Sequence, residues 1–237
     1  MTRDKLRTPL NHDMIALAHS ERLSAPGFFT ALMLIVTIVV LNLGLIAGPV
    51  AHGSTTTGDP ASMVKGTVGQ VLGVLSDKQI SRQSRQRRVL EIVAGRFDFT
   101  DMARSALGYN WKKLSPSQQE QFVPLFTAFM EDAYVTKIDS YSGQQVQFLG
   151  QTSTAPDAAE VKTVVQPANS GDQPIRIDYL VKQAGDDWKV YDVTVDDISI
   201  TANYRNQFNR MINERGFDGL MSAMREKQQE LRQSIGA

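Results

Sequence analysis

Apolar residues form a long uninterrupted run near the start of the chain. In the rest of the chain they recur with two different spacings, first helical and then alternating. From Phe28 to Ala47 there is no charged side chain, over a length of about 20 residues that could span a bilayer. A polar GSTTTG stretch follows, and the apolar positions then recur at helical spacing until about residue 145, where they begin to alternate. We therefore expect a targeting segment over 1–53, a linker over 54–59 and a folded domain over 60–234.

The helical spacing predicts a group of helices in the first half of the body. One begins at Pro60, where Asp59 supplies an N-cap and proline takes the first helical position. Others are expected over 81–94, ended by Gly95, and over 102–107. The longest covers 116–141 and opens with Ser115-Pro116-Ser117-Gln118, which matches a capping box.

Alternating apolar positions predict four strands after this group, around 146–148, 161–165, 175–181 and 188–190. Clusters of Pro, Gly, Asn and Asp separate them, which is typical of an antiparallel meander with one buried face. Two helices over 201–214 and 218–234 follow, with Gly216 between them as a C-cap. Grouped helices, grouped strands and grouped helices again indicate an α+β fold.

The composition excludes several kinds of chemistry. The chain has no cysteine, and its three histidines are His12, His19 and His52, all upstream of the predicted domain. Thiolate nucleophiles, histidine-based zinc sites and serine triads are therefore excluded from the domain. The 25 basic and 25 acidic residues balance, whereas a nucleic-acid-binding protein normally carries a basic excess. We expect no nucleic acid, metal or cofactor as a partner.

Acidic pairs are the remaining candidates for catalysis. Asp186-Asp187 lies in a turn composition and Asp196-Asp197 lies at the end of a predicted strand, so turn roles are favoured over a two-carboxylate mechanism. Asp192 stands alone within a strand and is expected to be a satisfied structural carboxylate.

A basic run opens the predicted helix 81–94. Arg82, Arg85 and Arg88 follow one another at spacings of three and should share one helix face. This face is either solvated or a docking patch for an anionic headgroup or an acidic partner.

Several segments resemble the MlaC family, the toluene-tolerance-type auxiliary proteins of ABC phospholipid transport systems. The resemblance covers about residues 60–232. The opening half matches at Phe97 to Ala103, Leu107-Gly108, Trp111, Leu114-Ser115 and Gln118-Gln119. The closing half agrees more specifically, at Trp188-Lys189-Val190-Tyr191-Asp192-Val193, Ile198-Ser199, Asn203 to Phe208 and Gly216 to Leu220. One departure is Asp197, where the family usually has glycine.

The resemblance implies an NTF2-like curved antiparallel sheet of about four strands packed with N- and C-terminal helices. It also implies a periplasmic carrier without enzymatic activity, which holds phospholipid acyl chains between sheet and helices. Such a carrier moves lipid between an inner-membrane ABC transporter complex and an outer-membrane lipoprotein complex. In this chain the pocket should be lined by residues that share a helix or strand face: Phe126, Met130, Tyr134, Ile177, Tyr179, Tyr204 and Phe208.

The sequence also allows other ligands and other functions. The ligand could be a hopanoid or another polycyclic lipid instead of a phospholipid. The protein could also be a carboxylate-dependent hydrolase on an NTF2-like scaffold, or a membrane-anchored adaptor that binds only protein. Ala51-His52-Gly53 before the polar linker favours signal-peptide cleavage, whereas the length of the apolar run favours an uncleaved anchor.

Overall fold

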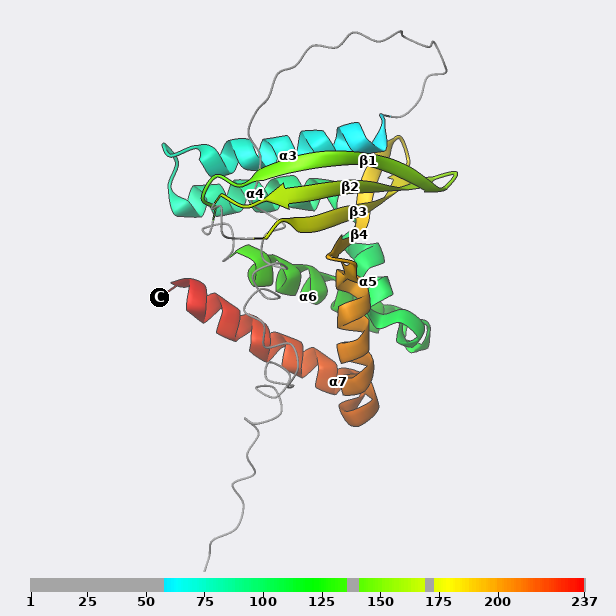
Figure 1. The fold of residues 1–237 in the computed structure, drawn as a ribbon. Helices are drawn as coiled ribbons and strands as arrows, with labels where there is room; N and C mark the ends of the chain where they lie inside the picture. The colour runs from blue at the N-terminus through cyan, green and yellow to red at the C-terminus, as the bar shows by residue number, and fades with distance from the viewer. Residues whose placement is uncertain (1–57, 136–140, 169–172, 237) are drawn as a thin grey trace, which may run out of the picture.

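The computed structural model describes residues 58–135, 141–168 and 173–236, and these form helices, then a sheet, then helices (Figure 1). The elements are α3 (Pro60–Ser76), α4 (Arg82–Arg96), α5 (Phe99–Leu107), the 3₁₀ helix η2 (Gly108–Lys113), α6 (Pro116–Val135), β1 (Gln145–Ala155), β2 (Ala158–Gln166), β3 (Ile175–Ala184), β4 (Asp187–Val195), β5 (Ile198–Ser199) and α7 (Ile200–Gly236). The α+β class predicted from the period change is confirmed.

Side-chain caps begin the helices where the sequence predicts them. The Asp59 carboxylate accepts a hydrogen bond from the Ser62 N–H at 2.9 Å. At the start of α6 the Ser115 N–H donates to Gln118 Oε1 at 2.9 Å and the Gln118 N–H donates to Ser115 Oγ at 3.2 Å. This reciprocal pair is the predicted capping box, and it satisfies two backbone donors that no helical carbonyl can reach.

Two predicted helix boundaries between α4 and α5 were wrong. Helix α4 continues through Gly95 to Arg96, and the Phe97 N–H still donates to the Val93 carbonyl at 2.9 Å. Phe97 then becomes extended and forms a parallel bridge with Val190 at the edge of β4. Asp98 caps α5, which therefore begins at Phe99 instead of residue 102. The end of α4 and the start of α5 depend on pairing with a strand that is distant in sequence, so the local pattern could not predict them.

The end of the predicted helix 116–141 also needs correction. Helix α6 is described as far as Val135, the segment 136–140 lies outside the described residues, and Tyr141 is not helical. The two C-terminal helices are confirmed. They meet at a kink at Gly216, whose φ of 71° is left-handed and favours glycine.

The strands form one antiparallel sheet in the order β1-β2-β3-β4-β5. The four predicted strands are present, and the two-residue β5, which was not predicted, adds to β4 through the pair Val195 and Ile198. Asp196 and Asp197 connect them with φ values of 46° and 67°, as a two-residue primed hairpin turn requires. Asp197 therefore keeps a left-handed conformation at the position where the family usually has glycine.

The sheet separates a buried face from a polar one. Strand β2 alternates strictly, with its buried positions at Ala159, Val161, Thr163 and Val165. Figure 1 shows α3 and α4 side by side along the sheet, with α6 and the two halves of α7 grouped away from them. The inner face of the sheet and these helices enclose one hydrophobic core.

Candidate functional site

An apolar cavity of about 90 Å³ lies between the inner face of the sheet, the α3–α4 pair and the end of α6. Its wall is formed by Thr67, Val68, Val71, Leu72, Val89, Leu90, Val93, Phe97, Phe99, Met102, Met130, Glu131, Tyr134, Val146, Val165, Ile177, Tyr179, Val193 and Ile200. Among these residues there is no lysine, arginine or histidine, so the wall offers no cation to an anionic group.

The two-residue repeat of a β-strand explains which sheet residues face the cavity. Ile177 and Tyr179 are two residues apart on β3 and therefore point to the same face. Val193 of β4 lies opposite Tyr179 in the register and extends this face sideways. The helix side comes from stripes at spacings of three and four, including Val68, Val71 and Leu72 on α3.

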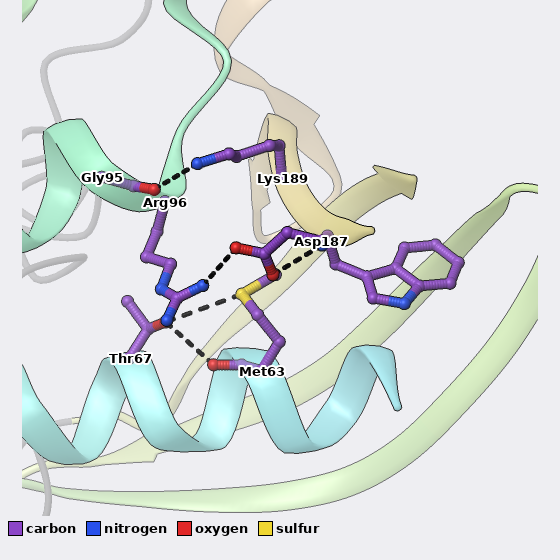
Figure 2. Close-up of polar contacts among 7 residues, drawn as sticks. Met63, Thr67, Gly95, Arg96, Asp187 and Lys189 are labelled. Carbon is purple, nitrogen blue, oxygen red and sulfur yellow. Dashed lines mark hydrogen bonds and ion pairs between the residues drawn. The ribbon is translucent and has the colours of Figure 1, made fainter. Parts of the chain in front are cut away.

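Four polar side chains interrupt the apolar wall, and two of them have partners within the protein. Thr67 Oγ1 donates to the Met63 carbonyl at 2.8 Å, within its own helix (Figure 2). The hydroxyls of Tyr134 and Tyr204 are hydrogen-bonded to each other. Burial, Tyr204 and the charge of Asp192 raise the pKa of Tyr134 well above its usual value. Both groups are thereby satisfied without a ligand.

The other two polar groups, Glu131 and Tyr179, form no hydrogen bond or ion pair within the described residues. Burial, reinforced by the neighbouring Asp132 charge and opposed by Arg232, raises the pKa of Glu131. Tyr179 is only 6% exposed, and burial, with the charge of Asp178, raises its pKa. These two side chains are the unpaired polar groups of the wall.

The seven predicted lining residues separate into two groups. Met130, Tyr134, Ile177 and Tyr179 lie in the cavity wall. The structure does not place Phe126, Tyr204 and Phe208 there. Their rings form an aromatic cluster between α6 and α7, with centroid distances of 6.3 Å for Phe126 and Tyr204, 6.4 Å for Phe126 and Phe208, and 5.5 Å for Tyr204 and Phe208.

The reason is the position of each residue along α6, since Phe126, Met130 and Tyr134 share one helix face. Phe126 packs on α7, and the last turn, with Met130 and Tyr134, reaches the cavity. Periodicity predicts the shared face but not which element covers it at each turn. The α3 and α4 residues of the wall were missed because an apolar stripe is also what a plain core requires. Glu131 was missed because an acidic residue on a long helix is normally solvated.

Polar tethers hold the α3–α4 pair to the sheet at one end of the pair, where α3 begins and α4 ends. At the end of α4, Arg96 pairs with Asp187 at 2.8 Å and the Lys189 ammonium donates to the Gly95 carbonyl (Figure 2). At the start of α3, Gln151 of β1 donates to Asp59 at 2.7 Å. These contacts fix the position of the helical wall relative to the sheet.

The acidic pairs lie in turns. Asp186 is in the β3–β4 hairpin, Asp187 pairs with Arg96, and Asp196 and Asp197 form the β4–β5 turn. None of these four lines the cavity. Within the described residues there is also no cluster of acidic or histidine side chains that could hold a metal ion.

Asp192 has the structural role expected from its sequence context. Its carboxylate accepts hydrogen bonds from Ser199 Oγ at 2.5 Å, from the Thr201 N–H at 3.1 Å and from Thr201 Oγ1 at 2.9 Å. These bonds connect β4, β5 and the start of α7.

The three arginines of the predicted docking patch are not equivalent. Arg82 and Arg88 are exposed on α4. Arg85 is half-buried, its guanidinium donates to the Asp77 carbonyl at 3.2 Å, and its Nε is buried without a partner among the described residues. Arg85 therefore contributes to the connection between α3 and α4.

No helix of the described residues is long and apolar enough to cross a membrane. The apolar run 28–47, the proposed cleavage site at 51–53 and residues 54–57 of the linker lie outside those residues.

Comparison with known proteins agrees with the fold. The profile of the MlaC protein family matches residues 65–226. The intermembrane phospholipid transport system binding protein MlaC of Haemophilus influenzae is 24% identical over 123 residues, which span 51% of this chain and 57% of that protein. A phospholipid-binding protein from Ralstonia solanacearum, solved in complex with a phospholipid, superposes with a TM-score of 0.65 and 26% identity, over 74% of this chain and 99% of that one. Since the profile match covers well over half of the chain, the protein belongs to the MlaC family.

Proposed function

We propose that this protein is a periplasmic carrier that holds phospholipid acyl chains in the cavity between the sheet and the helices. It would move lipid between an inner-membrane ABC transporter complex and an outer-membrane lipoprotein complex. The observation that carries the proposal is the apolar cavity itself, in a chain that belongs to the MlaC family and resembles a phospholipid-bound structure.

The physical need for such a cavity follows from the cost of exposing hydrocarbon. Burying one CH₂ contributes about 0.8 kcal/mol, so a chain of about 15 methylenes exposed to water would cost on the order of 12 kcal/mol. A lipid that crosses an aqueous space therefore needs an apolar sheath, and the sheath needs no catalytic group. The wall described above, apolar except for four side chains, meets this need.

Binding a whole acyl chain requires the cavity to widen. A cavity of about 150 Å³ holds one benzene molecule, and the present volume of about 90 Å³ is smaller still. One side of the wall is the α3–α4 pair, which meets the sheet mainly through apolar side chains and is tethered at residues 59 and 95–96. We infer that lipid entry moves these helices away from the sheet about those tethers.

The exposed arginines of α4 support a docking role beside this wall. Arg82 and Arg88 would contact an anionic headgroup or an acidic surface of the partner complex, whereas Arg85 would hold the local structure. Reversing the charges of Arg82 and Arg88 should weaken association with vesicles that contain anionic lipid, most strongly at low salt. The melting temperature should stay nearly constant, in contrast to Arg85→Glu. If the association at low salt is unchanged, Arg82 and Arg88 only form a solvated face of α4.

Lipid extraction tests the main proposal most directly. The protein is expressed with its full N-terminal segment, purified from the exported fraction, extracted with organic solvent and analysed by mass spectrometry. Copurified phospholipid, in an amount near one lipid per protein, supports the carrier. A polycyclic lipid would identify a hopanoid carrier, while an empty protein that hydrolyses a substrate or binds only a protein partner would refute the proposal.

A further inference from the structure

The cavity wall contains two polar side chains without a hydrogen-bond or ion-pair partner among the described residues. The hydroxyl of Tyr179 lies on the inner face of β3, and the carboxylate of Glu131 lies on the last turn of α6. Neither has a hydrogen-bond or ion-pair partner in the described part of the chain. Tyr179 is buried and Glu131 is half-buried, and buried polar groups in proteins are normally paired, so their unpaired state in an apolar wall calls for an explanation.

Neighbouring residues of the same types show what a purely structural role looks like. Tyr134 also lines the cavity, but its hydroxyl is bonded to Tyr204. Asp132 follows Glu131 in sequence, does not line the cavity and pairs with Arg232 at 2.8 Å. Arg232 is thereby engaged by another carboxylate. Among the polar side chains of the cavity wall, the unpaired state is specific to Tyr179 and Glu131.

The chemistry of each group indicates what would pair with it. A buried tyrosine hydroxyl stays protonated and can donate to a carbonyl oxygen, and burial raises the pKa of Tyr179 further. In a lipid whose chains fill the cavity, the ester carbonyls are the acceptors adjoining those chains. A carboxylate accepts only, and its strongest hydrogen bonds are those from a cation.

We propose that Tyr179 and Glu131 are the polar contacts for the bound lipid, and that they favour an ester-linked phospholipid whose headgroup carries an ammonium group. Tyr179 donates to an ester carbonyl, and Glu131 accepts from the headgroup ammonium. The absence of any lysine or arginine from the wall leaves the phosphate to solvent. This inference rests on the proposed lipid-carrier function and assigns it a preferred lipid class.

Competition between two lipids in one sample tests the Tyr179 contact. Delipidated protein is incubated with vesicles that contain equal amounts of diacyl and dialkyl phosphatidylethanolamine, and the lipid recovered with the protein is quantified by mass spectrometry. One neutral hydrogen bond corresponds to an enrichment of the diacyl form of about fivefold. Tyr179→Phe should reduce this ratio to near one. Tyr109→Phe, at an exposed tyrosine outside the cavity wall, should keep the ratio.

A second competition tests Glu131. With phosphatidylethanolamine and phosphatidylglycerol at equal amounts, the wild type should recover about tenfold more of the ammonium lipid. Glu131→Gln should bring the ratio near one, and Asp132→Asn should leave it unchanged. Because both lipids compete for the same protein, a lower yield of folded variant does not alter either ratio.

The outcomes separate this inference from the proposed function. Ratios near one in the wild type, or ratios that Tyr179→Phe and Glu131→Gln leave unchanged, overturn the polar contacts and leave the lipid carrier intact. Recovery of no lipid of any kind with the wild type refutes both. Removing a hydroxyl that has no partner should not weaken the empty fold. A lower melting temperature of delipidated Tyr179→Phe would therefore contradict the unpaired state of this hydroxyl.

Discussion

Enlarging Ile177 to tryptophan tests whether the cavity is a binding site or only a defect in the core. Ile177 is 1% exposed and forms part of the cavity wall. Val181 lies on the same face of β3, is fully buried and is not part of that wall. Tryptophan at the two positions therefore adds bulk next to free volume in one variant and next to packed side chains in the other.

The structure indicates how much stability each of the two tryptophan substitutions should cost. Overpacking a filled core typically costs ~1–3 kcal/mol, which for a domain of this size lowers the melting temperature by roughly 2–4 °C per kcal/mol. We expect Val181→Trp to show at least this cost. At Ile177 the cavity of about 90 Å³ can take part of the larger ring, so the cost should stay below ~1 kcal/mol.

The assay combines two measurements: the melting temperature of the delipidated protein and the amount of lipid recovered per mole of protein after expression. Ile177→Trp should keep most of the thermal stability and lose most of the lipid, because the ring occupies the space that an acyl chain needs. Wild-type lipid content in Ile177→Trp, or a loss of stability as large as that of Val181→Trp, would refute the reasoning and identify the cavity as ordinary core.

Three further predictions concern structure and processing. Asp192→Ala should lower the free energy of unfolding by ~3 kcal/mol, because it removes several buried hydrogen bonds to a carboxylate, and thermal unfolding beside the exposed control Asp186→Ala checks this. Burial alone would raise the pKa of Asp98, but hydrogen bonds from the Asp101 N–H and Lys182, with nearby positive charge, lower this pKa below its ordinary value. Its stabilising contribution should therefore be complete above the unfolded pKa and disappear as the pH falls through the folded pKa. Denaturant unfolding of Asp98→Asn from pH 7 to 2 should show the difference from wild type shrinking at the acid end, and a constant difference would contradict this sign. We also expect cleavage near 51–53, which N-terminal sequencing of the exported protein would decide, and an intact apolar run in washed membranes would indicate a tethered carrier.

The sequence alone determined the class of the fold and most of its local structure. The change from helical spacing to alternation is enough to predict grouped helices and an antiparallel sheet, since each period places apolar side chains on one face. Caps such as Asp59 and the Ser115–Gln118 box are local hydrogen bonds, so a few residues suffice to recognise them. The strand face shared by Ile177 and Tyr179 follows from the period of two in the same way.

Only the tertiary structure decided which apolar faces meet the cavity. Phe126 and Met130 are one turn apart on the same face of α6, yet Phe126 packs against α7 and Met130 lines the cavity, because the element that covers this face changes along the helix. The end of α4 depends on the pairing of Phe97 with β4, which is distant in sequence. Whether Arg85 is solvated, or whether Tyr179 and Glu131 have partners, depends on which side chains the fold brings near them. Such contacts join residues far apart in the chain, and no local pattern encodes them.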